Sequence, residues 1–131
     1  MHLFQSCRKT NLTERRYLMN RYFSKEKLGE LTFYKIPKML FTDKKYNTLS
    51  VCAKVLYCML LDRASLSKEN GYIDSNGNVI VFMTNSQACD LLSCSHEKVS
   101  KLFKELEAFN LIERKKQGLC RTSIIYPKLP S

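Results

Sequence analysis

The chain has 131 residues, and its 22 Lys and Arg residues outnumber its 12 Asp and Glu residues, which gives a formal net charge of +10. This length suits one domain and excludes two full ones, while a hydrophobic share of 44% with 7 Phe and 7 Tyr excludes disorder over the whole chain. The strongly basic balance favours a polyanionic partner.

Membrane, secretory and metal-binding classes find no support in the sequence. The longest mostly apolar run, 51–61, contains Lys54 and falls short of the ~20 apolar residues that cross a bilayer. The N-terminus lacks an uncharged hydrophobic stretch, so we expect no signal peptide, no membrane association and a cytoplasmic protein. Six cysteines without a C-x-x-C pair, and only His2 and His96, predict reduced thiols, no metal and no other cofactor.

The first third of the chain carries weak signals. Residues 1–31 hold seven Lys or Arg and three Glu with little hydrophobic pattern, which predicts a basic N-terminal extension, weakly structured or partly helical. Residues 31–34 (Leu-Thr-Phe-Tyr) predict a short strand. Pro37 then opens a helical turn, because proline suits a first helical position.

A stronger pattern begins at Ser50, which is the expected N-cap of an amphipathic helix. The apolar residues behind it recur at three- and four-residue spacing and predict a helix to about Ala64, followed by a loop at 67–70. Residues 72–82 then have strand-favouring ends around Asn76-Gly77, a dipeptide typical of tight hairpin turns, and predict a β-hairpin.

A helix-turn-helix pattern follows. Thr84 and Gln87 fit a capping box for a helix over 85–92, and Ser95 can cap a second helix after a turn of about three residues. The buried face of the second helix is formed by Val99, Leu102, Phe103, Leu106 and Phe109, while its outer face carries His96, Glu97, Lys98, Ser100, Lys101, Lys104 and Glu105. Asn110 suits a left-handed C-terminal position.

The pattern ends in a second hairpin. Residues 111–115 and 122–126 favour strands joined by a loop at 116–121, and a hairpin placed directly after a helix-turn-helix is a wing. The expected fold is therefore α+β: a winged helix, with an additional β-hairpin before the helix-turn-helix. We assign this domain to 32–127 and a C-terminal tail or start of a linker to 128–131.

This arrangement predicts binding of double-stranded DNA, since the second helix of such a unit enters the major groove and reads base edges near its N-terminus. The candidate residues of this recognition helix are Ser95, His96, Lys98, Ser100, Lys101 and Lys104. Glu97, in the same first turn, could accept a hydrogen bond from cytosine, but an interaction with the helix dipole explains it better.

The wing and the first helix add further candidate contacts. The wing residues Arg114, Lys115, Lys116, Gln117 and Arg121 can follow the DNA backbone or enter the minor groove, although solubility alone also favours lysine at a hairpin tip. Thr84, Asn85 and Ser86 can donate to a phosphate at a helix N-terminus, or serve only as helix caps.

Catalytic signatures are missing from the sequence. It has no G-x-x-x-x-G-K-[ST] phosphate loop and no histidine pair to hold a metal beside a nucleophilic tyrosine. Asp62 and Glu69 flank a helix end without a partner cluster. We therefore expect a binding module and not an enzyme.

Several short stretches resemble the N-terminal domain of RepA-type plasmid replication initiators. The specific portion is 33–78, with stretches at 33–38 (FYKIPK), 46–50 (YNTLS) and 70–74 (NGYID). The similarity continues through 92–95 (LSCS) to Tyr126 and covers 32–127. Tyr72 stands where members often have Trp. The resemblance implies a winged helix that binds repeated origin sequences as a homodimer to start plasmid replication, and a further C-terminal domain that engages host replication proteins.

Two other functions remain open at this point. A winged-helix transcriptional regulator shares the pattern from Thr84 to Tyr126 but need not carry the block at 34–74. A winged-helix protein-interaction module would dock its second helix on a partner protein; Lys98, Lys101 and Lys104 argue against this, because cations at one-turn spacing favour phosphate.

Overall fold

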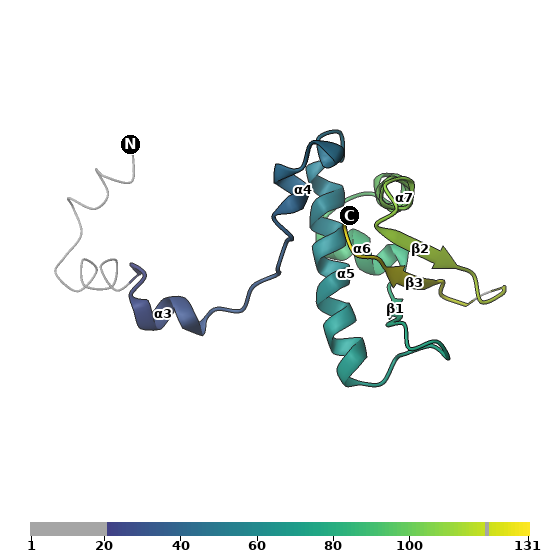
Figure 1. The fold of residues 1–131 in the computed structure, drawn as a ribbon, viewed down its shortest axis with the longest axis horizontal. Coiled ribbons are helices and arrows are strands. Elements are labelled where there is room, and N and C mark those ends of the chain that lie inside the picture. The colour runs from purple at the N-terminus through teal and green to yellow at the C-terminus, as the bar shows by residue number, and fades with distance from the viewer. Residues whose placement is uncertain (1–20, 120) are drawn as a thin grey trace. The chain divides into compact units, whose positions relative to one another are not determined.

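The computed structural model describes residues 21–119 and 121–131, and these fall into two compact units divided between Phe33 and Tyr34 (Figure 1). The first unit contains the short helix α3 (Lys25–Glu30), which begins at Ser24, whose Oγ accepts a hydrogen bond from the Lys27 N–H at 3.2 Å. None of the residues of α3 is buried. The remainder of the expected extension, 1–20, lies outside the described residues.

The strand predicted at 31–34 is wrong. A strand needs a neighbour that satisfies its backbone groups, and the strands of the described sheet, all of which lie between Val81 and Pro127, pair only with one another. Phe33 and Tyr34 are 62% and 51% exposed. The strand-favouring composition of this stretch therefore has no partner to pair with in the described chain.

The second unit opens with two short helical segments. Pro37 precedes α4 (Met39–Thr42), as predicted, and its carbonyl accepts from the Leu40 N–H at 3.2 Å. The 3-10 helix η1 (Lys44–Tyr46) follows, and Asp43 caps it by accepting from the Lys45 N–H at 2.9 Å. Leu40 and Tyr46 are buried, so this segment belongs to the core.

Helix α5 (Val51–Glu69) begins as predicted but ends later. The Ser50 Oγ accepts from the Ala53 N–H at 3.2 Å, which confirms the N-cap. The predicted end at Ala64 and the loop at 67–70 are wrong, because no Gly or Pro interrupts the helix before Gly71, which has a φ of +79°. Ser67 is buried within the helix.

The hairpin predicted over 72–82 is present in a reduced form. Ile73 and Val79 form a single antiparallel bridge around the Asn76-Gly77 turn, and Gly77 adopts a φ of +83°. The N–H groups of Asn78 and Asn76 both donate to the Asp74 carboxylate, which lowers the pKa of Asp74 and fixes the turn.

The last residues of the predicted 72–82 hairpin pair with a different strand. Strand β1 (Val81–Phe82) pairs with β3 (Ile124–Pro127), which also pairs with β2 (Ile112–Lys115), so that the antiparallel sheet has the order β1-β3-β2. The register places Val81 and Arg114 beside Ile125, and Lys115 beside Ile124.

The helix-turn-helix is confirmed in its details. Helix α6 (Asn85–Leu92) has both reciprocal hydrogen bonds of the capping box between Thr84 and Gln87. Ser93 ends it in the left-handed region with a φ of +53°, and Ser95 caps α7 (His96–Ala108) by accepting from the Lys98 N–H at 3.2 Å. Asn110 has a φ of +59°, as expected for the residue that redirects the chain into β2.

One core joins these elements. Figure 1 shows α5 running past both the helix-turn-helix and the sheet, and buried residues from every element between α4 and β3 form a single cluster. Residues 128–131 also lie against this unit: the Tyr57 hydroxyl donates to the Lys128 carbonyl, and the Ser131 N–H donates to the Tyr46 hydroxyl at 3.1 Å. A helix-turn-helix followed directly by an antiparallel hairpin is a winged helix.

Candidate nucleic-acid interface

The exposed side of α7 collects the basic residues predicted to contact DNA. Its opposite side packs into the core through Val99, Leu102, Phe103 and Leu106, and this fixes which side chains face outward. His96, Lys98, Lys101 and Lys104 are all exposed. Lys101 meets Glu97 at 3.6 Å, but both side chains are at least 75% exposed, so a phosphate can replace this partner at little cost.

Two of the predicted contact residues hold the helices together. The Asn85 side-chain amide donates to the Ser100 hydroxyl at 3.1 Å, which ties the start of α6 to the middle of α7. Thr84 is engaged in the capping box, with its Oγ1 accepting from the Gln87 N–H at 3.0 Å. Ser86 and Ser95 are exposed at the first turns of the two helices, where Ser95 is also a cap.

The predicted wing residues separate into groups that face different ways. Arg114 turns toward α7, where its guanidinium pairs with Glu107 and lies 4.9 Å from the centre of the Phe103 ring. Lys115, the next residue along the strand, turns to the other side of the sheet, as alternation along a strand requires. Lys116, Gln117 and Arg121 are exposed in the loop beyond the paired strands.

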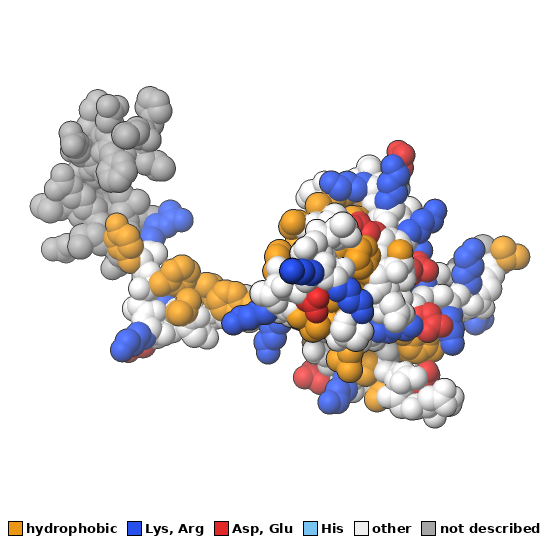
Figure 2. Space-filling view, turned by 45° about the horizontal axis from the view of Figure 1, so that its top comes forward, with side chains coloured by type: hydrophobic (Ala, Val, Ile, Leu, Met, Phe, Trp, Pro, Cys, Tyr) orange, Lys and Arg blue, Asp and Glu red, His pale blue; other side chains and the backbone are white. Residues whose placement is uncertain are grey.

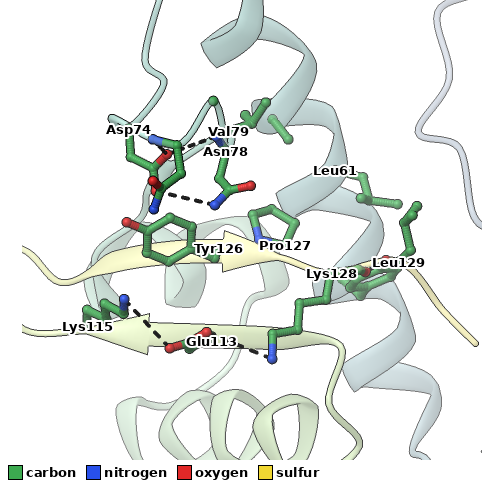
Figure 3. A pocket seen from close by; sticks show the side chains of 14 residues that line it. Leu61, Asp74, Asn78, Val79, Glu113, Lys115, Tyr126, Pro127, Lys128 and Leu129 are labelled. Atoms are coloured by element: carbon green, nitrogen blue, oxygen red, sulfur yellow. Dashed lines mark hydrogen bonds and ion pairs between the residues drawn. The ribbon is translucent and has the colours of Figure 1, made fainter.

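Figure 3 shows the surroundings of Lys115, in a cavity of about 470 Å³ between the outer face of the sheet, α5 and the 74–78 turn. Its ammonium lies 5.2 Å from the centre of the Tyr126 ring and 3.9 Å from Glu113, which also meets Lys128 at 3.8 Å. Lys115 therefore faces away from α7, because successive side chains of a strand point to opposite faces.

A second, smaller concavity lies on the α7 side of the wing. It has a volume of about 210 Å³ and is lined by Thr84, Asn85, Phe103, Arg114, Thr122 and Ser123, among others. The start of α6, the body of α7 and the root of the wing thus meet at one place. Sequence reasoning missed Thr122 and Ser123, although two hydroxyl residues directly after Arg121 were a usable signal.

Glu105 was expected on the outer face of α7, and this expectation is wrong. Its carboxylate is half-buried and accepts from the N–H and the hydroxyl of Ser50 at the start of α5. Because this carboxylate turns toward α5, its negative charge does not lie on the exposed side of α7 that carries Lys98, Lys101 and Lys104.

The thiols and acidic side chains of the described residues are the remaining candidates for other chemistry. Cys52, Cys58, Cys89 and Cys94 are free thiols, as predicted, and burial raises the pKa of the Cys58 thiol. No group of three or more His, Cys, Asp or Glu within 21–119 and 121–131 could hold a metal ion. Among the same residues, no helix is both long and apolar enough to cross a membrane.

Fold and surface together define a winged-helix protein in which α7, the second helix of the helix-turn-helix, has a basic exposed side. The chain matches the family model for the N-terminus of replication initiator protein A (RepA) over residues 32–129, and it belongs to this family.

Solved structures and a curated relative agree with this membership. A structure described as the N-terminal domain of a DNA binding protein is 35% identical, with a TM-score of 0.71 and 86% of each chain covered. A Rep-DNA complex is 34% identical, with a TM-score of 0.71 and 85% of each chain covered. A 41 kDa protein of Lactobacillus helveticus is 34% identical over 102 residues, which are 78% of this chain and 29% of that protein. The chain therefore spans under a third of that relative's length.

Proposed function

We propose that this chain binds double-stranded DNA sequence-specifically at repeated sites of a plasmid replication origin, in the cytoplasm, and so helps to initiate replication. The observation that carries the proposal is the basic side of α7, where Lys98, Lys101 and Lys104 are exposed and can reach phosphates and base edges. The relative solved as a Rep-DNA complex, at 34% identity, supports the same role.

Within this proposal the candidate residues have distinct tasks. His96 and Lys98 lie in the first turn of α7, which approaches base edges in helix-turn-helix proteins, while Lys101 and Lys104 lie further along and reach phosphates. Lys116, Gln117 and Arg121 extend the contact through the wing loop. Asn85, Ser100 and Arg114 act by holding α6, α7 and the wing in register.

We also propose that the DNA-bound form is a homodimer. A single module buries only about 600 to 1,000 Å² on DNA, and two modules on half-sites one or more helical turns apart increase both affinity and specificity. Contacts with host replication proteins belong, in this proposal, to a part of the initiator outside the winged helix.

Footprinting of the DNA around the encoding gene tests the function. Repeated protected sites at regular spacing are expected for an initiator, whereas one site overlapping a promoter would indicate a transcriptional regulator. With roughly 6 to 10 phosphates neutralised in a dimer, affinity should fall by about 10³ to 10⁵ between 50 and 200 mM salt. A flat salt response would contradict DNA binding through these cations.

A further inference from the structure

The tip of the wing carries a large apolar side chain in full contact with solvent. Leu119 is 97% exposed, more than any other large hydrophobic residue in the described chain. It follows Gly118, which has a φ of +127°, and the Arg121 N–H reaches back to the Gly118 carbonyl at 3.5 Å. Leu119 therefore stands at the outer end of a turn whose backbone begins with a conformation that suits glycine.

The surroundings of Leu119 are basic. Residues 116–123 contain no Asp or Glu, and both Lys116 and Arg121 are exposed. In Figure 2 the projecting hairpin ends in hydrophobic atoms with Lys and Arg side chains next to them. These cations match a phosphate backbone, but a leucine side chain has no donor to offer a phosphate. A contact of this side chain with DNA would need apolar surface, which the sugars and the faces of the bases offer.

The wing has the reach for such a contact. Strand pairing stops at Lys115 and Ile124, so 116–119 and 121–123 lie beyond the paired strands. Four residues out and four back span at most about 13 Å, and the minor groove is about 6 Å wide and 7.5 Å deep. The root of the wing is fixed on α7 by Arg114, through Glu107 and Phe103, so the position of α7 in the major groove also determines where the tip lies.

We propose that Leu119 enters the minor groove beside the site read by α7, inserts between two neighbouring base pairs and bends the DNA there. The inference rests on the proposed DNA binding and adds a deformation step to it. Lys116 and Arg121 neutralise phosphates on the two sides of the groove, while the leucine leaves water for the face of an unstacked base. Pyrimidine-purine steps unstack most readily, so the wing also selects sequence where it makes no base-specific hydrogen bond.

The test uses a duplex that carries one protected site, with fluorophores at its two ends to report the bend by energy transfer. The parent is expected to bend this duplex by about 20 to 90°. Leu119→Ala is expected to lose most of the bend and about tenfold in affinity, whereas Leu119→Met retains both. Leu129→Ala is the matched control, since Leu129 is 89% exposed but lies outside the wing.

Two outcomes would overturn the proposal while leaving DNA binding intact: a parent complex with straight DNA, or a Leu119→Ala complex as bent as the parent's. A parent that does not bind the duplex would instead remove the proposed function, and this inference with it. A further readout separates insertion from a structural effect. Replacing a TA step in the flanking DNA by AA should lower the DNA affinity of the parent but leave that of Leu119→Ala unchanged. The parent and Leu119→Ala should also have the same melting temperature.

Discussion

The carboxylate of Glu105, in helix α7, accepts two hydrogen bonds from Ser50, one from its N–H at 2.6 Å and one from its hydroxyl at 2.8 Å. The same hydroxyl accepts from the Ala53 N–H and so caps α5. A negative charge at a helix N-terminus is also favourable to the helix dipole. One carboxylate thus connects the start of α5 to α7, the helix proposed to face DNA.

Glu105→Ala should therefore destabilise the domain by about 1.5 to 3 kcal/mol, the range for hydrogen bonds to a charged group. Urea unfolding measures this loss, and a double-mutant cycle with Ser50→Ala should show strong coupling between the two residues. Glu97→Gln, on the exposed side of the same helix, is the control and should change stability by less than about 0.5 kcal/mol. Additive effects of Glu105→Ala and Ser50→Ala would contradict the link.

Lys101→Ala and Lys104→Ala should each weaken DNA binding by about three- to tenfold per protomer and lower the slope of log K against log salt by about 0.9 per protomer, or about 1.8 for the proposed dimer. Because these side chains are exposed, the melting temperature should stay the same. Fluorescence anisotropy at several salt concentrations measures affinity and slope together. Lys68→Ala, near the end of α5, removes the same charge elsewhere; an equal loss in that variant would mean that net charge, and not α7, governs binding.

Substitutions at Glu107 can distinguish whether Arg114 contacts phosphate or holds the wing against α7. If its guanidinium contacted phosphate, removal of the competing charge in Glu107→Gln would strengthen DNA binding. We expect the reverse, a loss of about threefold, because Glu107 and Arg114 together hold the wing against α7. The double variant with Arg114→Ala should bind no worse than Arg114→Ala alone. Glu113→Gln removes the same charge from the exposed position next to Arg114 and should leave affinity unchanged.

The buried hydroxyl of Tyr57 should make the folded domain less stable in alkaline solution. Burial raises the pKa of its hydroxyl to about 12, from an ordinary value near 10. The unfolded chain releases this proton first, so stability is complete below pH 10 and falls as the pH rises toward 12, by roughly 2 to 3 kcal/mol in all. Urea unfolding at pH 9 and pH 11 measures the decrease, and Tyr57→Phe should lack this part of it while being less stable at pH 9.

Local signals explain why much of the fold could be predicted from the sequence. The capping box of Thr84 and Gln87, the cap at Ser95 and the left-handed Asn110 depend on residues within one or two turns of each other, and all three are present. The strand expected at 31–34 failed because a strand depends on a partner that composition does not supply.

In the candidate interface, too, features set by local sequence could be predicted and features set by a distant partner could not. Helical spacing correctly placed Lys98, Lys101 and Lys104 on the exposed side of α7. The directions of Glu105 and Arg114 could not be predicted, because each is fixed by an element 55 or 7 residues away in sequence. The opposite orientations of Arg114 and Lys115 follow from strand alternation once the register is known.

The hydrogen bonds of residues 128–131 also bear on protease sensitivity and on fragment design. The peptide carbonyl of Lys128 is the acceptor for the buried Tyr57 hydroxyl. Trypsin can therefore cut after Lys128 only when this segment detaches from the domain by local unfolding. Lys116 and Arg121, exposed in the wing loop, need no such opening. Brief digestion should therefore cut in the wing before it cuts after Lys128. A recombinant fragment ending at Pro127 would lack the groups that anchor both Tyr57 and Tyr46.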